Sequence, residues 1–323
     1  MRPALTELSL GCAQLGNLYR AISEEQAHAT VDAAWDAGIR YFDTAPHYGL
    51  GLSERRLGDA LAGRPRDAFV VSTKVGRRLE PLPGPEGHDN EGFDVAATHR
   101  RIWDFTRDGI LRSLEESLER LRLERVDVAY IHDPDDHYRE ALDLAYPALD
   151  ELRAQGAVSA IGVGMNQSAM LADFARNTDM DFLMLAGRYT LLEQDALDDL
   201  LPVCERRGIG IVAAGVFNSG LLSRSAPAEH AKYDYADAPA NLVERARRIA
   251  EVCQRHGSSL PAAALAFPLT HPAVVSVCVG ARSAAQIERN ARLLRERVPA
   301  ELWAELKAEN LLRPDAPVPV PVG

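Results

Sequence analysis

Polar residues suited to proton transfer stand next to three apolar stretches of the chain. Asp43, Lys74 and His132 each close such a stretch, and Tyr48 follows Asp43 in a turn rich in proline and glycine. A lysine that ends a buried strand is costly without an anionic partner, so we expect Lys74 to pair with Asp43. A carboxylate, a phenol, an ammonium and an imidazole in one place are suited to moving a proton between an alcohol and a carbonyl.

Each of these residues also has a purely structural explanation. Asp43 could cap a turn, Tyr48 could pack loosely over it, and His132 could be a satisfied histidine at a strand end. The chemical interpretation therefore depends on all the residues meeting at one edge of the fold.

A repeated alternation of strands and helices would bring them to such an edge. Apolar strands are predicted at residues 8–13, 39–42, 69–74, 126–132, 160–166, 182–186, 209–214 and 274–280. Eight strands alternating with helices favour a closed (β/α)8 TIM barrel, and the first strand lacks the Gly-x-Gly-x-x-Gly that opens a Rossmann domain. Ligands bind such barrels at the carboxyl ends of the strands. We therefore expect residues 1–323 to form one barrel domain.

Local signals predict the other segments. Ser23 and Ser53 are expected N-caps of the helices that follow them. Residues 76–107 are expected to form a long irregular, lid-like insertion, in which Trp103 either stacks on a substrate ring or packs the loop onto the barrel. Residues 226–238 are expected to be a surface loop, and residues 312–323 a loose tail.

Composition limits the classes of function. The net charge of −11, from 36 basic and 47 acidic residues, disfavours nucleic acid or an anionic membrane as a partner. No apolar run approaches the roughly 20 residues of a spanning helix, and no signal peptide is visible. Four scattered cysteines suggest a reduced, cytoplasmic protein, which we expect to be a monomer or small homo-oligomer. The acidic cluster 133–137 comes from one loop, so no metal site is expected.

Longer motifs carry a family resemblance. Phe-Asp-Thr-Ala-x-x-Tyr-Gly from Phe42, Ser-Thr-Lys ending at Lys74, and Tyr-Ile-His-Asp from Tyr130 occur in this order. With them the chain resembles the aldo-keto reductase family over nearly its whole length. The resemblance implies that Tyr48 is the acid/base and that Lys74 lowers the pKa of Tyr48. It also implies that Asp43 holds Lys74 and that His132 orients the substrate oxygen.

The same resemblance implies a nicotinamide nucleotide cofactor. Asn166 would bind the carboxamide, Tyr189 would stack under the ring, and the backbone of residues 216–221 would surround the pyrophosphate. Tyr189 could instead pack beneath a loop, and residues 218–219 could form an ordinary turn. The implied cofactor residues are Gly11, Cys12, Ala13, Asn166, Tyr189, Val216, Phe217, Asn218, Ser219, Gly220, Leu221, Gly280, Ala281, Arg282, Gln286 and Asn290.

The chain departs from the commonest family pattern at several positions. Met165 stands where serine is usual, and Ala186 where glutamine often contacts the carboxamide. Gly280 and Gln286 stand where NADP-dependent members often carry lysine and arginine. Without these two cations NAD is favoured over NADP, although Arg282 could still pair with a 2′-phosphate.

Four shorter sequence segments narrow the resemblance to the aldose 1-dehydrogenase branch of the family. The similar segments are 45–54, 107–118, 131–137 and 185–194. They imply oxidation of the anomeric C1 hydroxyl of an aldose, best L-fucose or a related sugar, to the lactone with hydride transfer to NAD(P)+. His47 and Trp103 are the expected substrate contacts. Open alternatives are an NADPH-dependent aldehyde or ketone reductase, a pyridoxal 4-dehydrogenase, and a nucleotide-binding regulatory subunit without turnover.

Overall fold

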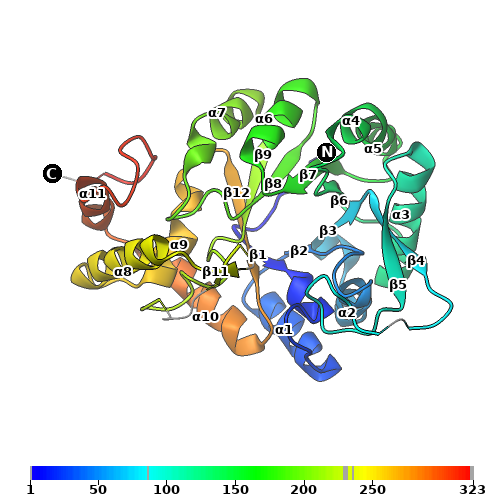
Figure 1. Cartoon of the computed structure of the whole chain (residues 1–323), viewed down its shortest axis with the longest axis horizontal. Coiled ribbons are helices and arrows are strands. Elements are labelled where there is room, and N and C mark those ends of the chain that lie inside the picture. Colours follow the sequence, from blue (N-terminus) through cyan, green and yellow to red (C-terminus); the bar gives the residue numbers. More distant parts are fainter. Residues whose placement is uncertain (1, 86, 228–231, 235, 321–323) are drawn as a thin grey trace.

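Parallel strands close into a barrel at the centre of the molecule (Figure 1). The computed structural model describes residues 2–85, 87–227, 232–234 and 236–320. Around the barrel the strands follow the order β1, β12, β9, β8, β7, β6, β3 and β2, and β2 pairs with β1. The barrel strands are β1 (Leu8–Gly11), β2 (Tyr41–Asp43), β3 (Val70–Val75), β6 (Val128–His132), β7 (Ala160–Met165), β8 (Phe182–Ala186), β9 (Gly210–Ala214) and β12 (Val274–Gly280). The predicted (β/α)8 barrel is confirmed.

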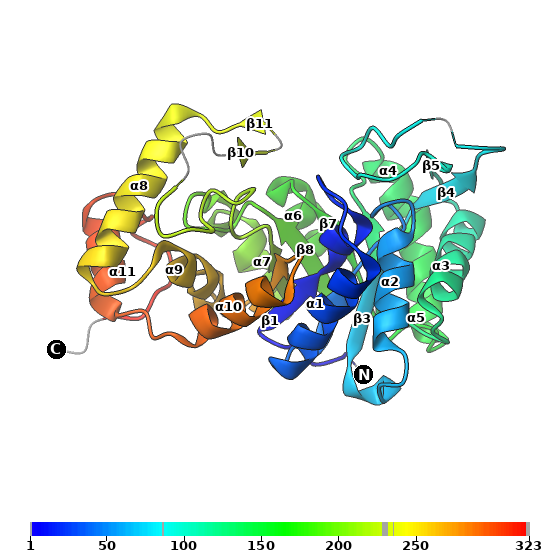
Figure 2. The ribbon, with the colours of Figure 1, turned by 90° about the horizontal axis from the view of Figure 1, so that it is seen from below.

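Helices surround the barrel and alternate with its strands (Figures 1 and 2). They are α1 (Glu24–Asp36), α2 (Leu52–Leu61), α3 (Arg107–Leu121), α4 (Tyr138–Glu140), α5 (Tyr146–Ala154), α6 (Ser168–Asn177), α7 (Leu200–Arg207), α8 (Ala240–Arg255), α9 (Leu260–Ala266), α10 (Ala284–Arg295) and α11 (Ala300–Ala308). A π-helical turn, Ala141–Ala145, joins α4 to α5. No helix in the described ranges is long and apolar enough to cross a membrane.

Side chains fill the barrel interior. One buried cluster lies inside the strands and includes Tyr41, Tyr130 and Phe182, while a larger one lies between the strands and the helices. The Tyr41 hydroxyl lies 3.0 Å from Ser72 Oγ and 3.2 Å from the Tyr130 hydroxyl, so the buried polar groups are paired. A packed interior leaves the ends of the strands as the place for a ligand.

The start of α2 differs from the prediction. Ser23 caps α1 by accepting a hydrogen bond from the Gln26 amide, as expected, but the N-cap of α2 is Gly51 and not Ser53. Ser53 lies buried in the first turn, where its hydroxyl donates to the Cys12 carbonyl at 2.7 Å. It therefore ties α2 to the loop after β1, a tertiary contact that overrides its capping preference.

The segment 76–107 is more regular than expected. It contains β4 (Arg77–Pro81) and β5 (His99–Trp103), which pair antiparallel with Arg77 opposite Trp103. A second small ribbon pairs β10 (Lys232–Tyr233) with β11 (Ala236–Asp237), within the stretch predicted as a surface loop, where residues 228–231 and 235 lie outside the described residues. Figure 2 shows both ribbons on the same side of the barrel.

The end of the chain is packed where a loose tail was predicted. Leu312 and Ala316 are buried, and Lys307 Nζ donates to the Pro314 and Ala316 carbonyls at 3.0 and 2.6 Å. The packing could not be predicted from the proline-rich composition, because the apolar residues of this segment contact α8 and α11 only in the folded chain. Val320 is 78% exposed, and residues 321–323 lie outside the described residues.

Candidate active site

Lys74 joins the expected proton-transfer residues at the mouth of the barrel. Its ammonium donates to Asp43 Oδ2 at 2.6 Å, to the Thr44 carbonyl at 2.9 Å and to the Tyr48 hydroxyl at 3.1 Å. Ser72 Oγ donates to the other Asp43 oxygen at 2.7 Å. The predicted ion pair of Lys74 with Asp43 is thus present, and it is fully hydrogen-bonded in a buried place where an unpaired charge would be costly.

Close backbone contact fixes the loop that carries Tyr48. A Cβ added to Gly49 would come within 2.2 Å of the Gly16 carbonyl oxygen, and one added to Gly16 within 2.6 Å of the Tyr48 backbone. Two glycines therefore let the loop after β1 press against the loop after β2. The Tyr48 ring stands at 90° to the His132 ring, with 5.9 Å between centroids.

Burial sets the protonation states of these groups. It raises the pKa of Tyr48, and the nearby Lys74 ammonium offsets only part of that rise. Burial by itself would lower the pKa of Lys74, but Asp43 and Tyr48 together outweigh it and the net shift is upward. Burial, followed by the charge of Lys74, holds the pKa of His132 well below its usual value. At neutral pH the site therefore holds a phenol, an ammonium and a neutral imidazole. Lys74 lowers the pKa of Tyr48, as expected, but burial raises this pKa by more.

A pocket of about 580 Å³ opens onto Tyr48, Lys74 and His132. The two expected substrate contacts, His47 and Trp103, both line it. Trp103 also stacks on Phe105, with centroids 5.8 Å apart and planes 14° apart, so it packs within its loop and faces the pocket. The wall combines polar and apolar residues, and its charged members besides Asp43 and Lys74 are Arg77, Glu91, Asp133, Asp135 and Asp136.

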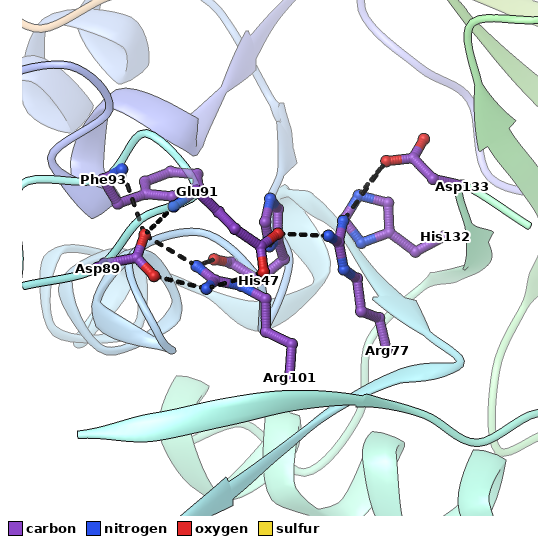
Figure 3. Close-up of polar contacts among 8 residues, drawn as sticks. All are labelled: His47, Arg77, Asp89, Glu91, Phe93, Arg101, His132 and Asp133. Carbon is purple, nitrogen blue, oxygen red and sulfur yellow. Dashed lines mark hydrogen bonds and ion pairs between the residues drawn. The ribbon is translucent and has the colours of Figure 1, made fainter. Parts of the chain in front are cut away.

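A network of ion pairs holds the lid segment over this pocket (Figure 3). Asp89 lies 2.6 Å from Arg101, which in turn donates to the His47 carbonyl at 3.1 Å. Glu91 lies 2.5 Å from Arg77. The sequence interpretation missed these residues, because their charges look like an ordinary solvated loop until β4 and β5 pair. Basic pairs at the two ends of the predicted insertion, with acidic residues between them, were the available signal.

A second pocket, of about 640 Å³, adjoins the first and shares Asn166, Ala186 and Gly280 with it. Ten of the expected cofactor residues line it: Asn166, Val216, Phe217, Asn218, Ser219, Gly220, Gly280, Arg282, Gln286 and Asn290. Gly11 and Ala13 line the first pocket instead.

The other expected cofactor residues, Cys12, Tyr189, Leu221 and Ala281, are buried and line neither pocket. The expected stacking position of Tyr189 is wrong in this structure. Its ring is buried and packs on Phe267, with centroids 5.1 Å apart. This arrangement matches the structural alternative given for Tyr189.

The second pocket has donors and acceptors that suit a nucleotide. Gln14 Oε1 and Asn218 Oδ1 are buried acceptors without a hydrogen-bond partner within the described part of the chain. Such acceptors fit ligand amide or hydroxyl groups. The arginines that line the pocket fit phosphate groups; they are Arg20, Arg224, Arg282 and Arg289. The sequence interpretation missed Gln14 and the arginines other than Arg282. Gln14 directly follows the first predicted strand, and the carboxyl ends of barrel strands are where ligands bind.

Comparisons with known proteins agree with this architecture. Residues 7–310 match the Aldo/keto reductase family. The chain is 51% identical over 313 residues to a D-threo-aldose 1-dehydrogenase from Pseudomonas sp, covering 96% of this chain and 95% of that protein. It is 40% identical over 327 residues to a pyridoxal 4-dehydrogenase from Microbacterium luteolum, covering 95% of each. An aldo-keto reductase from Bacillus halodurans in its holo form superimposes with a TM-score of 0.76 at 26% identity, covering 96% of this chain and 93% of that one.

The barrel, with a proton-transfer site beside a nucleotide-sized pocket, defines an NAD(P)-dependent oxidoreductase. The chain belongs to the aldo/keto reductase family.

Proposed function

We propose that the protein oxidises the anomeric C1 hydroxyl of a free aldose to the lactone and uses NAD+ as hydride acceptor. The observation that carries the proposal is the set of contacts through which Lys74 joins Asp43 to Tyr48 in a pocket with several polar and charged side chains. The 51% identity to a D-threo-aldose 1-dehydrogenase supports an aldose as substrate. We also propose a cytoplasmic location, supported by four free, buried cysteines.

In the proposed reaction the protein handles the proton. The Tyr48 phenolate takes the proton of the C1 hydroxyl, and the Lys74 ammonium, 3.1 Å away, stabilises that phenolate. Asp43 keeps Lys74 charged and directed at Tyr48. The neutral His132 ring donates from Nε2 to the same oxygen and orients it. NAD+, when bound, supplies the acceptor for the C1 hydride.

The first prediction concerns the substrate. NADH formation should be measured with L-fucose, L-galactose, D-arabinose, D-glucose and pyridoxal, and we expect L-fucose or a sugar that shares its configuration near C1 to give the highest kcat/KM. Pyridoxal belongs in the panel because of the relative that is 40% identical. Reduction of simple aldehydes without oxidation of any sugar would replace the dehydrogenase proposal with a reductase.

The preference for NAD+ rests on what surrounds Arg282. Gln286 Oε1 accepts a hydrogen bond from the Arg282 amide at 2.9 Å, so this side chain holds the loop, and its amide group brings no positive charge to a phosphate. A Cβ on Gly280 would meet the Gln14 side chain at 2.4 Å, so Gln14 fills the space where a longer residue would project. Neither of these two positions therefore carries the cation expected for NADP, whereas Arg282 keeps a charge that could pair with a 2′-phosphate.

The second prediction tests this preference by steady-state kinetics with both nucleotides. We expect a higher kcat/KM with NAD+ than with NADP+, and Arg282→Ala should reduce NADP+ use while it leaves NAD+ use nearly unchanged. Arg292→Ala is the matched control, because Arg292 lies on helix α10, which begins just after Arg282, but does not line the nucleotide pocket. A preference for NADP+ that survives Arg282→Ala would contradict the proposal.

A further inference from the structure

Asp133 has an unusual backbone conformation beside the reaction centre. It directly follows His132, and its φ of 40° lies in the left-handed region, which non-glycine residues rarely adopt. Its amide donates to the Gly164 carbonyl at 2.9 Å, so the neighbouring strand β7 holds it there. Strain of this kind, kept in place by surrounding contacts, is often found at functional sites.

The conformation brings the Asp133 carboxylate next to the substrate pocket (Figure 3). Its Oδ2 lies 3.5 Å from His132 Nε2 and 3.9 Å from Arg77 Nη1. Both distances are too long for good hydrogen bonds, and 36% of the side chain is exposed. Arg77 is itself fixed by Glu91 at 2.5 Å and by the ring of Trp103, 4.7 Å below its guanidinium. The carboxylate is thus positioned by charge and still able to accept a hydrogen bond from a ligand.

The groups attached beside the reacting carbon of the substrate determine which of them can donate a hydrogen bond to Asp133. When O1 of a cyclic aldose accepts a hydrogen bond from His132 Nε2, the polar groups closest to C1 are the ring oxygen and the hydroxyl on C2. The ring oxygen has no hydrogen to donate to a carboxylate, whereas the C2 hydroxyl has one. We propose that Asp133 accepts a hydrogen bond from the hydroxyl next to the reacting carbon and thereby selects substrates that carry it. This inference rests on the proposed aldose oxidation and names the residue that distinguishes a sugar from a simple alcohol.

The charges facing Asp133 allow it to be an acceptor at neutral pH. Burial, together with Asp135 of the same loop, raises the pKa of the Asp133 carboxyl to about 6, while Arg77 of β4 and Lys74 of β3 oppose the rise. The neutral His132 of β6 adds no charge. Above that pH the group is a carboxylate, and below it the protonated form is neutral and accepts a hydrogen bond more weakly. The KM for the sugar should therefore rise as the pH falls through about 6.

D-Arabinose and 2-deoxy-D-ribose test the proposal, because they differ only in the C2 hydroxyl. Hydrogen bonds to charged groups commonly change affinity about 10- to 100-fold, so Asp133→Gly should reduce the preference of the enzyme for D-arabinose by about that factor. Glycine suits the left-handed backbone at this position. Asp133→Asn, which keeps a neutral acceptor, should lie between glycine and wild type. Asp136→Asn is the control, because Asp136 lines the same pocket but is exposed.

The outcomes separate the two proposals. Wild-type oxidation of D-arabinose tests the aldose reaction by itself, and failure with every aldose would overturn both proposals. An active wild type whose preference for D-arabinose is unchanged in Asp133→Gly would overturn only the role of Asp133. Equal losses on both sugars would also overturn it, since they would mark Asp133 as a purely structural residue. Nucleotide binding, measured through tryptophan fluorescence, checks that each variant is folded.

Discussion

At the scale of single residues, the site combines one buried ion pair with groups that stay neutral. Lys74 and Asp43 can both be charged because each has several partners, while Tyr48 and His132 are pushed by burial toward their uncharged forms. A neutral imidazole can donate to a substrate oxygen without taking its proton. Tyr48 is then the group whose ionisation limits the oxidation.

The third prediction follows from the sign of the Tyr48 shift. Because the pKa of Tyr48 is raised, the phenolate is a small fraction at neutral pH and grows about tenfold with each pH unit. The kcat for aldose oxidation should therefore rise from pH 7 to pH 10 without a plateau. Tyr48→Phe should remove this rise and lower kcat by about 10²–10⁴-fold, with nucleotide binding retained. A plateau below pH 8, or near wild-type kcat in Tyr48→Phe, would contradict the assignment.

At the scale of elements, the ribbon of β4 and β5 makes the lid a fixed part of the pocket. Asp89 and Arg101 form a buried ion pair, with side chains 3% and 7% exposed, and the Phe93 amide donates to the same carboxylate at 3.3 Å. Tyr19 in the loop after β1 donates its amide to the Gly92 carbonyl at 2.8 Å. The lid is thus held both by its own ribbon and by a barrel loop.

The fourth prediction tests this anchoring. Removing one partner of a buried ion pair typically destabilises a protein by about 3–5 kcal/mol. Here we expect the destabilisation to be confined to the lid segment. Asp89→Asn should raise the aldose KM more than it lowers kcat, and limited proteolysis should cut within residues 76–107. Glu80→Gln is the control, because Glu80 pairs with Arg100 on the same ribbon with side chains 43% and 65% exposed. An unchanged KM and an intact lid in Asp89→Asn would show that the pair does not hold the segment.

At the scale of the whole molecule, the end of the chain extends the core beyond the barrel. Leu312 is 2% exposed and belongs to the same buried cluster as α8 and α11. The Arg313 amide donates to Gln194 Oε1 at 3.2 Å, which links this end to the loop before α7. Leu312, Arg313 and Gln194 line neither pocket, so their contacts should affect stability and not catalysis.

The fifth prediction concerns that packing. Leu312→Ala should lower the free energy of unfolding by about 2–5 kcal/mol, the usual range for leucine truncation in a core. The kcat at 25 °C should be unchanged. Val320→Ala is the control, since Val320 is 78% exposed. Denaturant unfolding of both variants makes the comparison, and equal stability of the two would show that the tail is loose as its composition suggests.

The sequence by itself determined the barrel and the meeting of Asp43, Tyr48, Lys74 and His132. Strand and helix periodicity is local, and parallel strands in a barrel bring their carboxyl ends to one edge, so residues at strand ends could be placed without coordinates.

Only the tertiary structure decided the rest, because burial and pairing depend on segments far apart in the chain. Tyr189 is buried by Phe267, and Ser53 is drawn to the Cys12 carbonyl. The pKa of Tyr48 rises because burial outweighs its lysine neighbour. Asp133 reaches the pocket because β7 fixes its backbone and Arg77 of the lid faces its carboxylate. Local propensity cannot predict these contacts, because each forms only when the barrel has closed and the lid has folded over it.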